Sequence, residues 1–142
     1  GCCGLSAVDD ARRVADRLEI PYYVMNFKQE FKKNVMDYFT AEYLKGKHDF
    51  ASFCTNPKMK KSTVRIVDQI DITMRKGYIY FTFHGTGFLQ NMVRVLTGTL
   101  LDVGYGKIQP AEVAEIMEKK DRKLAGPAAP AQGLTLIKVD YD

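Results

Sequence analysis

The sequence lacks several features that would each assign it to a particular class of protein. No stretch approaches the run of about 18 apolar residues that a membrane-spanning helix needs, so we expect a soluble protein. The chain has only three cysteines and no CxxC spacing, which argues against a disulfide framework and against a zinc site. A reducing cytoplasm fits this cysteine usage best. No charged segment followed by an apolar core opens the chain, so no export signal is expected.

Motifs of several common active sites are also missing. The sequence contains no GxxxxGK[ST] or GxGxxG nucleotide loop, no HExxH metal motif and no GxSxG nucleophile motif. His48 and His84 lie far apart in sequence, without an evident Ser or Cys partner for nucleophilic catalysis. We therefore interpret His48 as a loop residue and His84 as a strand residue at a sheet surface.

Positive charge, in contrast, is concentrated in two segments. The net charge of the 142 residues is only +4. The segment PKMKKSTVR contains four cations, Lys58, Lys60, Lys61 and Arg65. The segment EKKDRK contains four more against two acids, Lys119, Lys120, Arg122 and Lys123. Each segment could be a solvated loop or helix end, or a surface that binds RNA phosphates, and the charges alone leave both interpretations open.

Residues 1–46 have the pattern of an α-β-α unit. LSAVDDARRVADRLEI predicts a helix that starts near Ser6, PYYVMNF predicts a short strand, and a second helix is expected to end at Gly46. Because one strand needs a neighbour to form a sheet, we interpret this segment as a partial α/β unit.

After Gly46 the pattern changes to alternation, which predicts a β-hairpin. The first strand is predicted to direct four apolar residues to one face, namely Val64, Ile66, Ile70 and Ile72. The second strand, YIYFTFH, directs Ile79, Phe81 and Phe83 to one face, with Tyr78, Tyr80, Thr82 and His84 on the other. If that second face is uncovered, its aromatic rings could pack locally or stack on bases.

Two helices and a last strand complete the expected order. A long helix within residues 87–107 has an apolar stripe of Phe88, Met92, Val93, Leu96, Leu100 and Val103. Arg94 falls roughly opposite that stripe. A second helix is expected over 110–120, followed by the loop AGPAAPAQG and a final strand LTLIKVDY. This order predicts an α+β domain in which the helices pack on one face of a mainly antiparallel sheet.

Several motifs in this part of the chain occur in the same order in a known family. HDFASF, VRIVDQIDI, FTFHGTGFLQNMVRVLTGTLLDVGYGK, KDRKLAGPAAPAQGLTL and VDY resemble the C-terminal half of tRNA pseudouridine synthase A, the TruA family, over residues 44–142. Ala128 departs from this pattern, since the family usually has threonine there. The resemblance implies isomerisation of uridine to pseudouridine in the tRNA anticodon stem-loop, without a cofactor or an essential metal.

The resemblance also implies roles for particular residues. Arg94 matches the arginine of the family's MVR motif, which holds the nucleophilic aspartate ionised and correctly aimed. Leu134 and Leu136 match the apolar segment that packs under the target base, although packing in a strand core is the competing interpretation. The lysines at 58, 60 and 61, together with Arg65, are the predicted contacts to tRNA.

The matching nucleophile is missing from the sequence. In the family the aspartate belongs to an Arg-Thr-Asp-Gly motif of the N-terminal half, which this sequence does not contain. Asp49, Asp68, Asp71 and Asp102 lack that context, and we interpret them as surface or turn residues. The chain alone is therefore expected to be inactive.

Residues 1–46 resemble a different family, an internal segment of the tRNA-specific 2-thiouridylase, MnmA. This segment lacks that enzyme's SGGxDS loop, so Cys2 and Cys3 are not assigned its catalytic role. The predicted division is 1–46, thiouridylase-like, and 47–142, the TruA-like domain.

Three hypotheses follow for function. The chain is a pseudouridine synthase half that works as a homodimer or with a complementing N-terminal half, a tRNA-binding module without catalysis, or an inert fragment. The thiouridylase resemblance adds the alternative of a fragment of a tRNA 2-thiolation enzyme.

Overall fold

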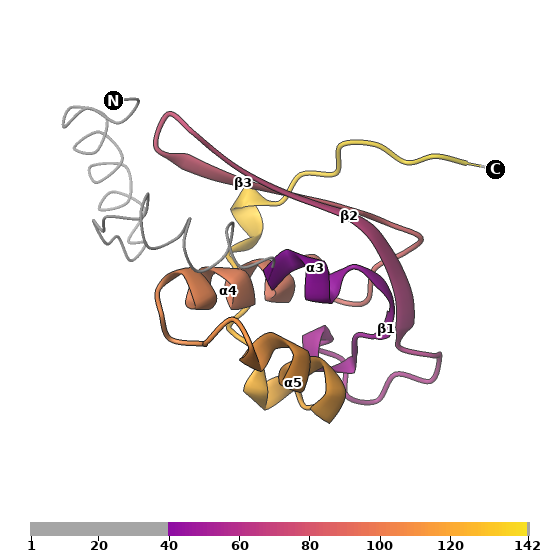
Figure 1. Ribbon diagram of the computed structural model, residues 1–142. Coiled ribbons are helices and arrows are strands. Elements are labelled where there is room, and N and C mark those ends of the chain that lie inside the picture. The colour runs from indigo at the N-terminus through magenta and orange to yellow at the C-terminus, as the bar shows by residue number, and fades with distance from the viewer. Residues whose placement is uncertain (1–39, 142) are drawn as a thin grey trace.

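The computed structural model describes residues 40–141, which contain one three-stranded sheet with helices packed against it (Figure 1). The strands are β1 (Gly46–Asp49), β2 (Val64–Arg75) and β3 (Tyr78–Gly85). The helices are α3 (Thr40–Leu44), α4 (Met92–Gly104) and α5 (Glu112–Lys119), with short 3₁₀ turns η2 (Ala51–Phe53), η3 (Arg122–Leu124) and η4 (Ala131–Gly133). The predicted α-β-α unit lies outside the described residues except for its last helical turns.

The predicted hairpin is confirmed. β2 pairs with β3 in antiparallel fashion, Ile70 opposite Phe83 and Arg75 opposite Tyr78. The two-residue turn places Lys76 at φ 52° and Gly77 at φ 81°. Positive φ at both central positions gives a turn whose twist matches that of the two strands, so a glycine suits the second position.

The predicted face of β2 is wrong in its first half. Val64 and Ile66 were expected inside, yet they are 36% and 40% exposed, while Val67 is fully buried. The physical reason is a register shift between Val67 and Gln69, where β2 contains an extra residue relative to β3. Such a bulge reverses the alternation, so the inward residues are odd-numbered before it and even-numbered, from Ile70, after it.

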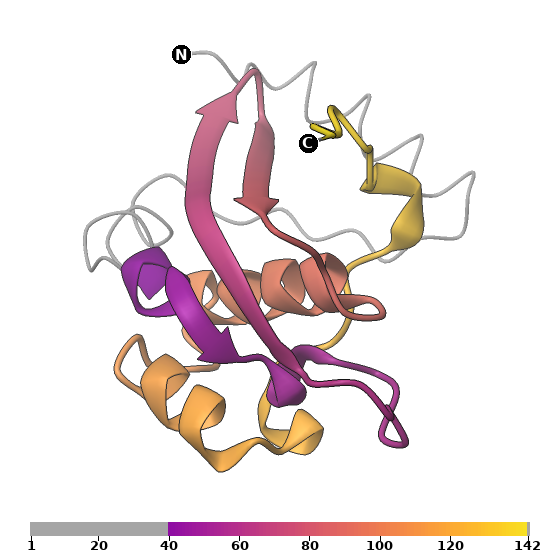
Figure 2. The same cartoon turned by 90° about the vertical axis from the view of Figure 1, so that its right-hand side faces the viewer.

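The helices pack on one face of the sheet and so confirm the α+β architecture (Figures 1 and 2). α4 starts at Met92, later than expected, which leaves Phe88 outside the helix and 41% exposed. Val95, rather than the predicted Val93, is fully buried in α4. The predicted inward residues of α5 are confirmed, since Val113, Ile116 and Met117 are all buried.

Two smaller predictions are corrected. His48 belongs to strand β1 and not to a loop, and its Nε2 lies 2.6 Å from the carbonyl oxygen of Lys45. The predicted final strand over 134–141 is wrong, because these residues pair with no strand of the described sheet and are exposed. A strand needs a neighbour to satisfy its backbone, and residues 40–141 offer none at this position.

Candidate functional site

Arg94 lies in the first turn of α4, and its guanidinium is held by two neutral acceptors. Its Nε donates to the carbonyl oxygen of Ala129 over 2.7 Å, and its Nη1 donates to Oδ1 of Asn91 over 3.1 Å. The side chain is half-buried. The predicted position opposite the apolar stripe is therefore correct, but the arginine is fixed against a loop rather than extended into solvent.

The loop of residues 125–130 reaches Arg94 because α4 allows an unusually close approach. A Cβ added to Gly98 would overlap the carbonyl group of Pro127, and one added to Gly126 would lie 2.8 Å from the carbonyl oxygen of Gly98. The hydroxyl of Thr99 accepts a hydrogen bond from the backbone N–H of Gly126 over 2.9 Å. The two glycines and this hydrogen bond fix the position of the loop along α4, and so bring Ala129 to Arg94.

Ala129 makes a reciprocal contact with Arg94. Its backbone N–H donates to the carbonyl oxygen of Arg94 over 2.9 Å, while its own carbonyl oxygen accepts from the side chain. The neighbouring Ala128, where the family pattern has threonine, packs against the core. The loop therefore positions Arg94 through backbone atoms of Ala129 and not through the side chain at position 128.

Asn91 positions the guanidinium from the other side. It occupies the left-handed region at φ 59°, which asparagine adopts more readily than most residues. While its Oδ1 accepts from Arg94, its Nδ2 donates to the hydroxyl of Thr55 over 2.9 Å. Sequence reasoning missed this residue; the signal was an asparagine three positions before the arginine, at the start of a helix.

The guanidinium retains donors for an anionic partner. Arginine has five N–H donors, of which two are used here, and Arg94 forms no ion pair within residues 40–141. A carboxylate or phosphate can accept two parallel hydrogen bonds from such a group. The site can therefore align and stabilise an anion.

Leu134 and Leu136 follow the Arg94-binding loop after η4. They are 53% and 79% exposed, so more than half of the surface of each residue is open to solvent. The same holds for Ile137 and Tyr141, which are 77% and 89% exposed. This stretch is an apolar surface that continues from the loop contacting Arg94.

The predicted RNA-binding cations lie on the loop between η2 and β2 and at the start of that strand. Lys58, Lys60 and Lys61 are exposed and form no side-chain hydrogen bond or ion pair among the described residues. Arg65 is half-buried, and its Nη1 donates to the carbonyl oxygens of Ser62 and Val64, both over 2.7 Å. The three lysines are thus available to a ligand, while Arg65 also stabilises the loop end.

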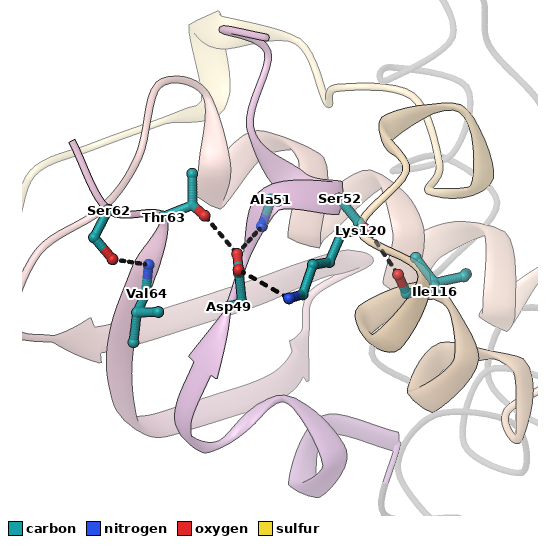
Figure 3. A network of polar contacts seen from close by, with 8 residues as sticks. All are labelled: Asp49, Ala51, Ser52, Ser62, Thr63, Val64, Ile116 and Lys120. Carbon is teal, nitrogen blue, oxygen red and sulfur yellow. Dashed lines mark hydrogen bonds and ion pairs between the residues drawn. The ribbon is translucent and has the colours of Figure 1, made fainter. Parts of the chain in front are cut away.

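Two aspartates interpreted as surface or turn residues form defined contacts. Asp68, at the β2 bulge, lies with its Oδ1 2.5 Å from Nδ1 of His84, and this contact lowers the pKa of the carboxyl group. The hydroxyl of Thr63 donates to Asp49 over 2.5 Å and is the main reason why the pKa of Asp49 is lowered (Figure 3). Neither forms a hydrogen bond or ion pair with Arg94 among the described residues.

Residues 40–141 contain neither a candidate metal site nor a helix that could span a membrane. Within residues 40–141, no three His, Cys, Asp or Glu side chains come together in a way that could hold a metal ion. None of the helices there is long and apolar enough to cross a membrane.

Comparison with known proteins assigns the family. A family model described as tRNA pseudouridine synthase matches residues 40–142. The chain is 46% identical over 100 residues to "tRNA pseudouridine synthase A 1" of Bacillus cereus, covering 70% of this chain and 40% of that protein. It is 46% identical over 101 residues to "tRNA pseudouridine synthase A" of Anaplasma phagocytophilum, covering 71% and 41%.

One match extends further toward the N-terminus. "tRNA pseudouridine synthase A" of Brevibacillus brevis is 40% identical over 129 residues, covering 91% of this chain and 49% of that protein. Coverage of this extent includes part of residues 1–46. The thiouridylase resemblance of that segment finds no support in these comparisons and stays a prediction.

The chain spans less than half the length of these relatives, between 40% and 49%. Its predicted motifs, its α+β architecture and the family match nevertheless agree over the same residues. The chain belongs to the tRNA pseudouridine synthase family, in the TruA group.

Proposed function

We propose that this chain supplies the arginine-bearing half of an enzyme that isomerises uridine to pseudouridine in the tRNA anticodon stem-loop. The observation that carries the proposal is Arg94, a guanidinium held by Ala129 and Asn91 with no carboxylate partner among residues 40–141. A fixed cation with unused donors suits a carboxylate brought by another segment.

The proposed chemistry divides between two parts of the enzyme. An aspartate from the complementing N-terminal half attacks the ribosyl-uracil system, and the glycosidic bond breaks. The base then reattaches through C5, which loses its proton, and the bond to the aspartate is broken again. Arg94 holds that aspartate in its ionised form and directs it, because a nearby cation favours the charged carboxylate. The role of Arg94 is electrostatic and orienting, and it transfers no proton itself.

The apolar segment has a role in the same proposal. Leu134 and Leu136 would form the dry wall beneath the flipped uracil, and their exposure here fits a surface that substrate and the complementing half cover together. Lys58, Lys60, Lys61 and Arg65 would contact the tRNA backbone. A soluble, cytoplasmic homodimer is part of the proposal by resemblance to the family.

The test is release of tritium from tRNA labelled at uracil C5. The N-terminal half of the Brevibacillus brevis relative, which is expected to contain the aspartate motif, would be added to this chain. We expect no release from either part alone, release from the mixture, and a loss of at least about a hundredfold with Arg94→Ala, the scale of removing one stabilising group from an active site.

Arg94→Lys is the matched variant. It keeps a cation but cannot donate two parallel hydrogen bonds, so it should recover only a small part of the rate. Equal rates for Arg94, Ala and Lys at this position would contradict the proposal. Binding of tRNA by the mixture without any release would favour the second candidate, a tRNA-binding module without catalysis.

A further inference from the structure

Two basic segments that are more than fifty residues apart in sequence meet at Asp49 (Figure 3). Thr63, at the end of the loop containing Lys58, Lys60 and Lys61, donates its hydroxyl to Asp49 Oδ1 over 2.5 Å. Lys120, at the end of α5, places Nζ 3.5 Å from Oδ2 of the same carboxylate. The carboxylate also accepts the backbone N–H of Ala51 over 3.0 Å.

Further contacts join η2 to α5, which precede the two segments, and shape the second segment itself. The hydroxyl of Ser52 in η2 donates to the carbonyl oxygen of Ile116 in α5 over 2.5 Å. After α5, Lys120 adopts φ 52° and redirects the chain, and Asp121 caps η3 by accepting the backbone N–H of Lys123 over 3.0 Å. Both views place the loop between η2 and β2 and the α5–η3 region at the same end of the molecule, away from the hairpin tip (Figures 1 and 2).

The charges at this end are mostly positive and exposed. Residues 58–65 contain four cations and no acid, and residues 118–123 contain four cations against Glu118 and Asp121. Every lysine of the two segments is exposed. Two acids of the first turn of α5, Glu112 and Glu115, lie farther back along that helix.

Asp49 fits a structural role at the centre of these cations. Its side chain is only 26% exposed and already has three partners, so it opposes little of the outward-facing charge. Its hydrogen bonds lower the pKa of the carboxyl group, the Thr63 contact contributing most. At neutral pH the carboxylate is therefore ionised.

The basic end also connects to the Arg94 site. The loop that contains Lys58 begins at Thr55, whose hydroxyl accepts the Asn91 amide that positions Arg94. One end of this loop therefore contacts the residue that positions Arg94. Regularly spaced phosphates match such a stretch of separate lysines better than a single compact anion would.

We propose that residues 58–65 and 119–123 form one continuous surface that binds the phosphate backbone of the RNA substrate, with Asp49 as the residue that holds the two segments together. The proposal rests on the proposed function for the identity of the RNA. It adds the second segment and the positioning role of Asp49. Sequence-independent contacts of this kind would fix the register of the RNA and leave selection of the uridine to the active site.

The experiment measures the affinity of the full chain for an anticodon stem-loop RNA at several salt concentrations. Removing one cation that neutralises a phosphate should reduce the slope of log affinity against log salt by roughly 0.7 to 0.9. A triple variant of the first segment, Lys58→Ala, Lys60→Ala and Lys61→Ala, should reduce the slope by about 2. A triple variant of the second segment, Lys119→Ala, Arg122→Ala and Lys123→Ala, should reduce it by a similar amount, about 2.

Asp49→Ala separates positioning from charge. It makes the protein more positive by one unit, so a surface governed by net charge alone would bind RNA more tightly. We expect weaker binding instead, by about threefold, because the two segments lose their common partner. Asp71→Ala, on the exposed side of β2, makes the same charge change away from this surface and should bind as well as the parent or slightly better.

Each outcome decides between the proposals. If the first triple variant reduces the slope and the second leaves it unchanged, the continuous surface is wrong while the proposed tRNA contact stands. If the unmodified chain binds no RNA, the tRNA contact of the proposed function fails with it. Binding to vesicles containing phosphatidylserine that RNA does not displace would overturn the inference in favour of a membrane surface.

Discussion

The loop of residues 125–130 and the segment 134–141 are neighbours in the chain, yet they differ in how closely other residues pack against them. The loop packs so closely on α4 that Gly98 and Gly126 leave no room for a Cβ. The segment carries more apolar side chains, and its Leu136 and Tyr141 are 79% and 89% exposed. Within residues 40–141, the loop is packed against its neighbours, while the segment is left exposed.

The difference shows that an apolar sequence pattern indicates which residues favour burial, but not which segment covers them. An apolar side chain gains about 1.5 to 3 kcal/mol from burial, whichever segment covers it. The chain spans 40–49% of the Bacillus cereus and Brevibacillus brevis relatives, so the cover for 134–141 need not be encoded within it. Under the proposed function, that cover is the complementing half together with the bound base.

The largest expected difference is between one substitution in α4, on which the loop packs, and one in the segment 134–141. Leu100, fully buried in α4, and Leu136, 79% exposed, differ only in surroundings. Leu100→Ala should lower the free energy of unfolding by about 3 kcal/mol, because burial is reduced and a cavity is left behind. Leu136→Ala should change it by less than about 0.5 kcal/mol in the chain alone. Urea denaturation of both variants checks this; equal losses would mean that 134–141 is already packed.

The glycine contact between α4 and the loop gives the next largest effect. Gly98→Ala places a methyl group against the carbonyl of Pro127, and backbone on both sides must separate. We expect a loss of about 2 kcal/mol. Gly133→Ala is the matched control, because nothing lies within 4 Å of its added Cβ. Thermal denaturation checks this. If Gly133→Ala lowered the melting temperature as much as Gly98→Ala or more, the close approach of the loop to α4 would be contradicted.

The hydroxyl of Thr99 tests the packing of the loop on α4 through a single hydrogen bond. Thr99 accepts the N–H of Gly126 and donates to the carbonyl oxygen of Val95. Thr99→Val keeps the shape but leaves a buried N–H without its acceptor, so a loss of about 1 to 2 kcal/mol is expected. Thr97→Val is the matched variant, since the hydroxyl of Thr97 donates to Val93 in the preceding turn and should cost less. Equal effects on urea denaturation would show that the loop bond contributes nothing.

The smallest expected effect concerns Asp49, which lies outside both regions, and it depends on pH. Hydrogen bonding, chiefly from Thr63, lowers the pKa of Asp49 below its ordinary value of 3.8. Its stabilising contribution is therefore fully present above that value and is lost as the pH falls through the lower, folded-state pKa. Asp49→Asn should be less stable than the parent at neutral pH, and the gap should close below about pH 4. A gap that is constant across about pH 2 to 7 would contradict the assigned interaction.

Much of this fold followed from periodicity alone. The hairpin, α5 and the position of Arg94 opposite the apolar stripe of α4 were predicted because each depends on local spacing. The burial of Val67 in place of Ile66 was not, since a bulge shifts the alternation by one residue and leaves no mark in composition. Strand β1 was missed because four residues, GKHD, carry no alternating apolar signal.

The candidate site was predictable to a lesser degree. The motif around Arg94 made this residue a candidate, which stays a prediction. Its contacts with Ala129 and Asn91 could not be predicted, because they depend on how a distant loop packs and on a left-handed backbone at position 91. The meeting of the two basic segments at Asp49 likewise depends on tertiary contact between η2 and the end of α5. The final strand was predicted from a correct apolar pattern, but the strand also needed a neighbour that residues 40–141 do not contain.

The most direct test of the central claim is backbone hydrogen exchange over residues 134–141, measured in the chain alone and after addition of the N-terminal half of a relative. The chain alone should exchange quickly there, since among residues 40–141 no backbone N–H of this segment is bonded except that of Leu134, which donates to the carbonyl oxygen of Ala131. If the segment and Arg94 complete a shared site, adding the half should slow exchange at least about tenfold over 134–141 and leave the core of α4 unchanged. Unchanged exchange over 134–141, with the two halves shown to be associated, would contradict the claim that this surface is completed by the rest of the enzyme.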